Sequence, residues 1–169
     1  ETTVVRMSQP PPQPVSAPPL AANLSRYEDS DGKFSFDYPK NWTVDRSEDG
    51  TITATDLFLR DAIIFVQTAQ QGEPVSISQL MDAVKEGLAK QTGYVPLGDE
   101  TVTIGGLAAV KHNFRVLDSP EFNNINTVGV AIVVRRGDNV VILLEFAAET
   151  AYENKKAVLD IIATSLVVK

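Results

Sequence analysis

The chain has 169 residues, of which 43% are hydrophobic and 22% charged, values that are usual for a globular protein with one sizeable core. Its 15 Lys and Arg side chains face 22 Asp and Glu side chains, and the net charge of −7 argues against a broad nucleic-acid surface and against adsorption to anionic lipid. The absence of cysteine excludes disulfides and thiolate chemistry, and no apolar run approaches the roughly 18 residues that span a bilayer.

Most of the prolines lie in residues 8–22, a segment that favours extended polyproline II geometry and lacks the apolar area to fold. We therefore expect a flexible, proline-rich linker over residues 1–23 and a single domain over residues 24–169. A docking peptide for an aromatic groove is the alternative role of the linker. Because the chain begins at Glu1, we also consider that a signal peptide or a lipidated cysteine was removed upstream.

The sequence of the first half of the domain predicts two hairpins and one further strand. Residues 27–28 pair with residues 34–38 across an Asp31-Gly32 turn, and residues 42–44 pair with residues 51–56 around Gly50. Residues 62–70 are almost continuously apolar, which is typical of a central strand.

A helix follows, and the second half returns to strands. Ser76 and Gln79 fit a capping box, apolar residues recur at helical spacing as far as Leu88, and Gly93 lies where a helix C-terminus is expected. Four further strands are predicted by alternation and by turn glycines, over residues 100–104, 107–116, 127–135 and 140–147.

The final element is a helix that opens on Thr150 and Glu153, a second capping box, and gives way to a short extended segment over residues 165–168. Short connections predict antiparallel pairing. The sequence thus predicts an α+β fold, in which helices flank a single, largely antiparallel layer of six to seven strands as an α/β/α sandwich.

Two end motifs support this architecture. Residues 34–42, Phe-Ser-Phe-Asp-Tyr-Pro-Lys-Asn-Trp, place three aromatic side chains on one strand face, stop the strand at Pro39 and continue to the only tryptophan. This block resembles the opening hairpin of the PsbP family, the extrinsic subunits of photosystem II and their bacterial relatives. Residues 151–166 resemble the terminal helix of that family. The order of strands and helices between the two motifs is also similar, so the resemblance covers roughly residues 24–168.

The resemblance implies a PsbP-like fold, which DcrB-type bacterial lipoproteins and the Ran-binding nuclear-import factor share. Together with the proline-rich tail and the absence of a catalytic constellation, it predicts a non-enzymatic, extracytoplasmic accessory domain that binds a protein partner or a small ligand. We expect no cofactor and a monomer. A subunit associated with photosystem II is the alternative. The sequence has only one histidine and only Arg6 as a basic group in residues 1–25, so no metal or docking site transfers from the photosynthetic members.

His112 is the only residue around which we consider an enzyme, acting with a carboxylate as acid or base. It alternates with apolar Val110 and Phe114, and no nucleophile motif surrounds it. We therefore expect a hydrogen-bonded core histidine and no catalytic residue.

Acidic residues around Asp29 and Asp31 raise the question of calcium. An EF-hand alignment on Gly32 places Tyr27 and Tyr38 at ligand positions that need carboxylates, so that motif fails. An irregular calcium site completed by Asp56 or Asp61 stays open, although a solvated turn is favoured.

Two surfaces are candidates for partner binding. Lys111, Arg115 and Arg135, with Asn113 and Arg136, form a local basic strip if the adjacent strands bring them together. The loop of residues 117–126 is longer than a hairpin needs and carries Phe122 and Ile125 among polar residues. Folding of these two side chains onto the sheet edge is the alternative, and we take the loop as the stronger candidate.

Overall fold

The computed structural model describes residues 23–56, 61–70, 75–118, 120 and 123–169. The proline-rich residues 1–22 and Phe122 lie outside this set, so the linker of residues 1–23 stays a prediction. The described residues form ten strands and two α-helices. In chain order these are β1 (Leu24–Glu28), β2 (Phe34–Pro39), β3 (Trp42–Arg46), β4 (Ile52–Asp56), β5 (Ala62–Gln70), α1 (Ile77–Leu88), β6 (Tyr94–Ile104), β7 (Leu107–Val116), β8 (Thr127–Arg136), β9 (Asn139–Ala148), α2 (Tyr152–Ser165) and β10 (Val167–Val168).

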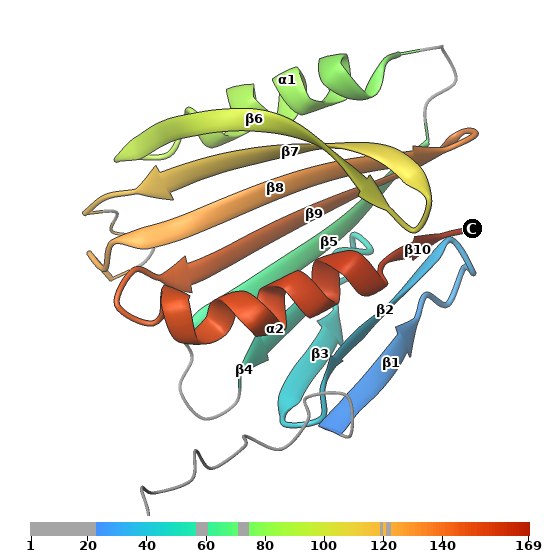
Figure 1. Ribbon diagram of the computed structural model, residues 1–169, viewed down its shortest axis with the longest axis horizontal. Coiled ribbons are helices and arrows are strands. Elements are labelled where there is room, and N and C mark those ends of the chain that lie inside the picture. Colours follow the sequence, from blue (N-terminus) through green and yellow to red (C-terminus); the bar gives the residue numbers. More distant parts are fainter. Residues whose placement is uncertain (1–22, 57–60, 71–74, 119, 121–122) are drawn as a thin grey trace, which may run out of the picture.

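Seven strands form the main sheet in the order β3-β4-β5-β9-β8-β7-β6, and every neighbouring pair is antiparallel. The predicted α+β class, the antiparallel pairing and the upper strand count are confirmed. Figure 1 shows α2 in front of this sheet and α1 behind β6 and β7. No helix of the described part is both long and apolar enough to cross a membrane.

The predicted single layer is wrong, because β1, β2 and β10 form a second sheet of three strands. Pro39 ends β2 as predicted, but the chain then enters β3 in the main sheet, so the two strands of the aromatic block do not pair with each other. The partner of β2 on its other side is β10, with Val168 opposite Phe34. A pairing between residues so far apart in the chain leaves no local sequence signal.

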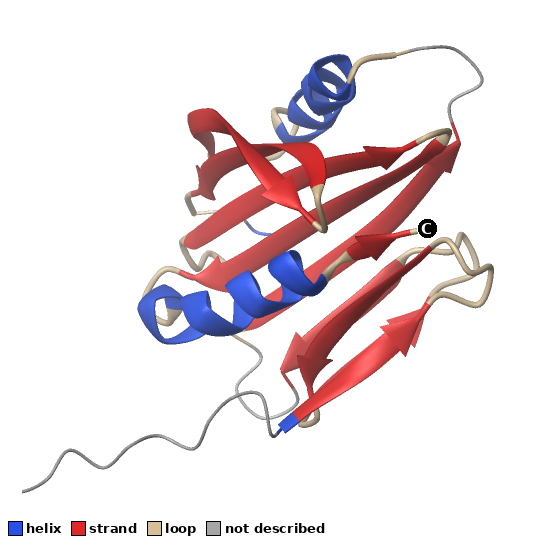
Figure 2. Cartoon of the chain, turned by 45° about the vertical axis from the view of Figure 1, so that its right-hand side comes forward, coloured by secondary structure: helices blue, strands red, loops and turns tan. Residues whose placement is uncertain are grey.

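The two helices cover different parts of the main sheet. The helix α1 packs against β7 and β8, whereas α2 packs against β2, β9 and β6 and so lies between the small sheet and the large one. Figure 2 shows the two helices on opposite sides of the strands. Each face of the main sheet therefore has its own core.

The α2-side core is the larger of the two. It contains the aromatic face of β2, with Phe34 and Phe36, together with Trp42 and alternate residues of β4, β5, β8 and β9. The rings of Phe34 and Phe36 stack with centroids 6.3 Å apart, and Tyr27 of β1 packs against both. The α1-side core is built on Phe114, Phe146 and the helix residues Leu80, Met81 and Leu88.

The first helix begins as predicted, but it ends differently. Ser76 accepts a hydrogen bond from the Gln79 backbone N–H and its own N–H donates to the Gln79 side chain, so the capping box is confirmed. The helix ends at Leu88 with Ala89 as its C-cap, and Gly93 lies in the following turn at φ 79°. A Cβ on Gly93 would stand 1.7 Å from the Leu117 carbonyl oxygen, which is why a glycine is needed there.

Two further boundaries differ from the prediction. β6 starts at Tyr94 and not at residue 100, with a β-bulge between Pro96 and Gly98, residues that ordinarily argue against a strand. It is an edge strand, where both residues are tolerated. The capping box predicted at Thr150 is wrong, because Ala151 occupies the N-cap of α2 without a side-chain hydrogen bond.

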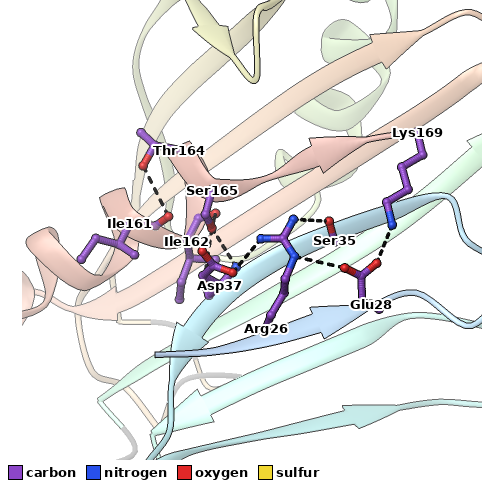
Figure 3. A network of polar contacts seen from close by, with 9 residues as sticks. All are labelled: Arg26, Glu28, Ser35, Asp37, Ile161, Ile162, Thr164, Ser165 and Lys169. Carbon is purple, nitrogen blue, oxygen red and sulfur yellow. Dashed lines mark hydrogen bonds and ion pairs between the residues drawn. The ribbon is translucent and has the colours of Figure 1, made fainter. Parts of the chain in front are cut away.

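Polar contacts fasten the C-terminus to the small sheet (Figure 3). Arg26 of β1 donates to Asp37 and Ser35 of β2, each at 2.8 Å. Ser165, the last residue of α2, accepts from the Asp37 backbone N–H at 2.8 Å, and Lys169 pairs with Glu28. Because these groups are partly exposed, they orient β10 against β2 more than they stabilise the fold.

Candidate binding cleft

The first helix leaves part of its sheet face open. Along β5 and β9, the side chains of Ile63, Phe65, Leu144 and Phe146 point to the α1 side. Only Phe146 among these four is fully buried, since α1 packs on β7 and β8 instead. The result is a cleft of about 960 Å³ with an apolar floor.

The rim of the cleft combines the end of α1 with the long loop before β8. Leu88 and Gln91 form one side, and Asn123, Ile125 and Thr127 form another. Ile125 is 50% exposed, and the loop that carries it is held where the Asn126 side chain accepts from the Asp118 backbone N–H at 3.1 Å. Ile125 therefore lies at the mouth of the cleft, in the loop that the sequence predicted as a contact site.

Polar residues also line the cleft, among them Asp61, Gln91 and Asn123. The Gln91 side-chain oxygen is buried and accepts no hydrogen bond within the described part of the chain. A buried acceptor without a donor costs free energy, typically about 1–3 kcal/mol. Gln91 lines the cleft, so this unpaired acceptor belongs to its wall.

The predicted basic strip is not one surface. Lys111 and Arg115 lie on the α2 side of β7, because the intervening residues of that strand point into the α1-side core. Arg135 lies on the α1 side, where its guanidinium donates to the Val75 carbonyl oxygen. Lys111 pairs with Glu100 at 3.1 Å and Arg115 pairs with Glu149, so these cations are engaged within the chain. A role of any one of them in partner binding stays a prediction.

His112 is buried and hydrogen-bonded, as predicted. It is 1% exposed, its Nε2 lies 2.7 Å from the Tyr94 hydroxyl, and its Nδ1 contacts Asp99. Asp99 also accepts from Lys85 of α1 at 2.7 Å, and that contact holds the pKa of the Asp99 carboxyl below its usual range. The chain of contacts joins α1 to β6 and β7, and it engages both ring nitrogens of His112.

The four aspartates considered for calcium form two separate ion-pair groups. Asp29 and Asp31 both face Arg46, at 3.6 and 2.9 Å. Asp56 and Asp61 both face Lys155, at 2.5 and 3.2 Å. Among residues that the structure describes, no three His, Cys, Asp or Glu side chains are grouped as a metal ion requires.

Sequence reasoning missed Gln91, Phe65 and Glu145. Gln91 and Phe65 line the cleft only because α1 covers one half of its sheet face. The hydrophobic periodicity of the sequence does not show which half a helix covers. Glu145 had a signal, since it is the only charged residue in the apolar stretch of residues 140–148. It is buried on the α2 side of β9, opposite Ile64 and Val130.

Comparison with solved structures relates this architecture to known proteins. The solution structure of cyanobacterial PsbP from Synechocystis superposes with a TM-score of 0.68 at 19% identity, covering 94% of this chain and 98% of that one. LpqN, described as involved in cell envelope biogenesis of Mycobacterium tuberculosis, gives a TM-score of 0.62 at 14% identity, covering 89% and 94%. The Saccharomyces cerevisiae Ran-binding protein Mog1p gives 0.59 at 13% identity, covering 86% and 95%.

These likenesses span nearly the whole length of each neighbour, and they establish the PsbP-like fold that the end motifs predicted. At such low identity they carry the fold alone. No family model matches the chain, and no curated protein does.

Proposed function

We propose that this PsbP-like domain is a non-enzymatic accessory protein that binds an apolar peptide segment of a partner protein in the cleft between α1 and the β5–β9 half of the sheet. The observation that carries the proposal is the cleft itself. It joins an apolar floor, an unpaired buried acceptor on Gln91 and the half-exposed Ile125 in one place.

Size and chemistry favour a peptide over a small polar molecule. A volume of about 960 Å³ lies near the upper end of what ligand sites of roughly 300–1,000 Å³ offer. Phe65 and Phe146 meet edge to face with centroids 6.0 Å apart, which provides an aromatic surface for apolar side chains. The backbone N–H of an extended peptide is the donor that Gln91 lacks.

We propose a non-enzymatic role because of the environment of His112. His112 lies on β7 under α1 and outside the set of residues that line the cleft. Its two ring nitrogens already contact Tyr94 and Asp99. The fold neighbours support a binding role only loosely, through the Ran-binding description of one of them.

An extracytoplasmic location is part of the proposal. It is supported by the description of LpqN as a protein of cell envelope biogenesis and by the proline-rich residues 8–22, which suit a spacer between a domain and an anchor. Fractionation of source cells, with the protein recovered in the envelope or secreted fraction, is the expected result. Recovery in the cytosol alone would contradict this part.

Association with photosystem II is a second candidate function. Cyanobacterial PsbP is the neighbour with the highest TM-score of the three compared, and the PsbP resemblance implies that setting. Purified protein should then co-sediment with photosystem II membranes and be released by salt. A source organism without photosystem II would remove this candidate.

Site-specific photocrosslinking tests the cleft. A photoreactive phenylalanine analogue replaces Ile125 in one variant and Leu97 in another, both expressed in the source organism. Leu97 is a matched control, because it is 56% exposed and does not line the cleft. We expect an adduct from position 125 whose partner peptide is apolar, and none from position 97.

The crosslinked segment is then synthesised and titrated calorimetrically into the purified domain. Ile125→Asp should weaken its binding at least about tenfold, which corresponds to about 1.4 kcal/mol, whereas Leu97→Asp should leave it unchanged. Adducts of equal yield from both positions, or equal binding by both variants, would overturn the cleft as the binding site.

A further inference from the structure

A second cavity lies on the opposite face of the main sheet and ends on a buried carboxylate. Glu145 of β9 is 4% exposed, lines this cavity, and its Oε1 accepts no hydrogen bond from any described residue. Buried acidic groups are ordinarily paired, because removing an ionised carboxylate from water is costly. A buried carboxylate oxygen without a donor, on a residue that lines a cavity, is therefore an unfilled position for a donor.

The cavity has a volume of about 170 Å³ and lies between α2 and strands β6 to β9. Its walls include aliphatic side chains such as Ile132 and Leu159. Its charged residues besides Glu145 are Asp160, Lys111 and Lys156. Lys111 is paired with Glu100 and Lys156 is exposed, so the aliphatic wall and the two carboxylates suit a molecule with a short hydrocarbon part and one positive charge.

Charged and titratable groups face Glu145 from two elements. From β7 comes Lys111, whose ammonium is held 3.1 Å from Glu100. From α2 come Lys156, Asp160 and Tyr152. Burial raises the pKa of Glu145 to about 8, with the Asp160 charge adding to the rise and Lys111 opposing it. The empty site therefore holds Glu145 in its neutral form at pH 7, and a cation in the cavity would favour the ionised form.

We propose that this cavity binds the ammonium group of a small primary alkylamine, with Glu145 as its buried counter-ion and Asp160 as a second acceptor. An ammonium group has three N–H donors, and the carboxylates of Glu145 and Asp160 provide acceptors around one cavity. A calcium ion fits less well, because it takes 6–8 oxygen ligands and the described residues offer no cluster of three acidic side chains here. The site is separate from the α1-side cleft and does not depend on its function.

The test uses n-butylamine as the probe and n-butanol as its uncharged counterpart, each titrated into the full-length protein and followed by NMR. At pH 8.5 we expect saturable shifts from n-butylamine, confined to residues of β9, α2 and their neighbours, and no saturation from n-butanol. Because the ammonium requires ionised Glu145, affinity should fall roughly tenfold for each pH unit below about 8. The loss between pH 8 and pH 6 is therefore roughly 50-fold, because Glu145 is half ionised at pH 8.

Substitutions test which residues bind n-butylamine. Glu145→Gln keeps the shape of the side chain and should abolish binding of n-butylamine, whereas Asp160→Asn should weaken it several-fold. Asp138→Asn, in the turn between β8 and β9 and outside the cavity, is the control and should bind as the unmodified protein does. A thermal melt of each variant confirms folding.

Three results would overturn the proposal. One is the absence of saturable binding of n-butylamine at pH 8.5. Another is equal binding by the Glu145→Gln variant, which would place the amine elsewhere. The third is equal binding of n-butanol, which would make the cavity a purely apolar space.

Discussion

The two faces of the main sheet are covered to different degrees. On the α2 side, a helix and a second sheet close a core that includes Phe34, Phe36 and Trp42, and the buried charged residues on this side include Glu145 and Asp56. On the α1 side, a single helix covers β7 and β8 and leaves Phe65 and Leu144 only half-buried. We infer that the first face holds the fold together and that the second presents an apolar surface to a partner.

The largest effect should come from the aromatic face of β2. Phe36→Ala removes a fully buried ring from the α2-side core, and such truncations cost about 3–5 kcal/mol. Chemical denaturation of the variant measures this loss. A cost below about 1 kcal/mol would show that the small sheet contributes little to the fold.

The next effect concerns the ion pairs that join α2 to the main sheet. Lys155 is largely buried between Asp56 and Asp61, and Lys155→Met deprives both carboxylates of this cation. Removing one member of a buried pair typically costs about 3–5 kcal/mol, because the remaining charge is left uncompensated. Lys90→Met, at an exposed position just after α1, is the matched control and should be near neutral. An equal loss of stability in both variants would contradict the role that we assign to the ion pairs of Lys155.

The Glu145→Gln substitution should stabilise the protein, by an amount that depends on pH. The folded carboxyl ionises near pH 8 and an ordinary one near 4.5, so the unfolded chain gives up this proton first. The contribution of Glu145 to the free energy of unfolding is therefore fully present below pH 4.5, and it is lost as the pH rises to about 8. The glutamine variant lacks that decline.

Melting curves over a range of pH test this prediction. The variant should match the unmodified protein at pH 4 and exceed it at pH 9. At about 1.36 kcal/mol per pH unit, the interval from 4.5 to about 8 sets an upper bound of about 5 kcal/mol on the gain. A difference that is constant across this range would show that Glu145 titrates normally.

The smallest effect should follow removal of residues 1–22. If they form a linker, the domain keeps its core, and the melting temperature should change by less than about 4 °C, the shift that 1 kcal/mol produces in a domain of this size. Calorimetry of the shortened chain measures it. A larger drop would make this segment part of the fold.

Much of the fold followed from the sequence because its signals are local. Alternating residues and turn glycines predicted the hairpins β1-β2, β3-β4 and β8-β9, and Ser76 with Gln79 predicted the start of α1. The division into two sheets did not follow, because Val168 pairs with Phe34 from the other end of the chain. The early start of β6 was hidden by Pro96, which an edge strand tolerates.

The candidate site was predicted only in part, for the same reason. Ile125 stands out as an apolar residue in a long polar loop, and it does lie at the mouth of the cleft. Gln91 and Phe65 carry no such signal, since their role depends on where α1 ends and on which strands it leaves open. The basic strip failed because Arg135 points to the opposite face from Lys111.

The most direct test of this division between the faces is a calorimetric titration of the crosslinked partner peptide into the Phe65→Ala variant, alongside its melting curve. We expect binding at least about tenfold weaker, with a loss of stability well below that of Phe36→Ala, because Phe65 lines the cleft and is only half-buried. Unchanged affinity together with a loss of stability equal to that of Phe36→Ala would mean that Phe65 belongs to the core, and it would contradict the account.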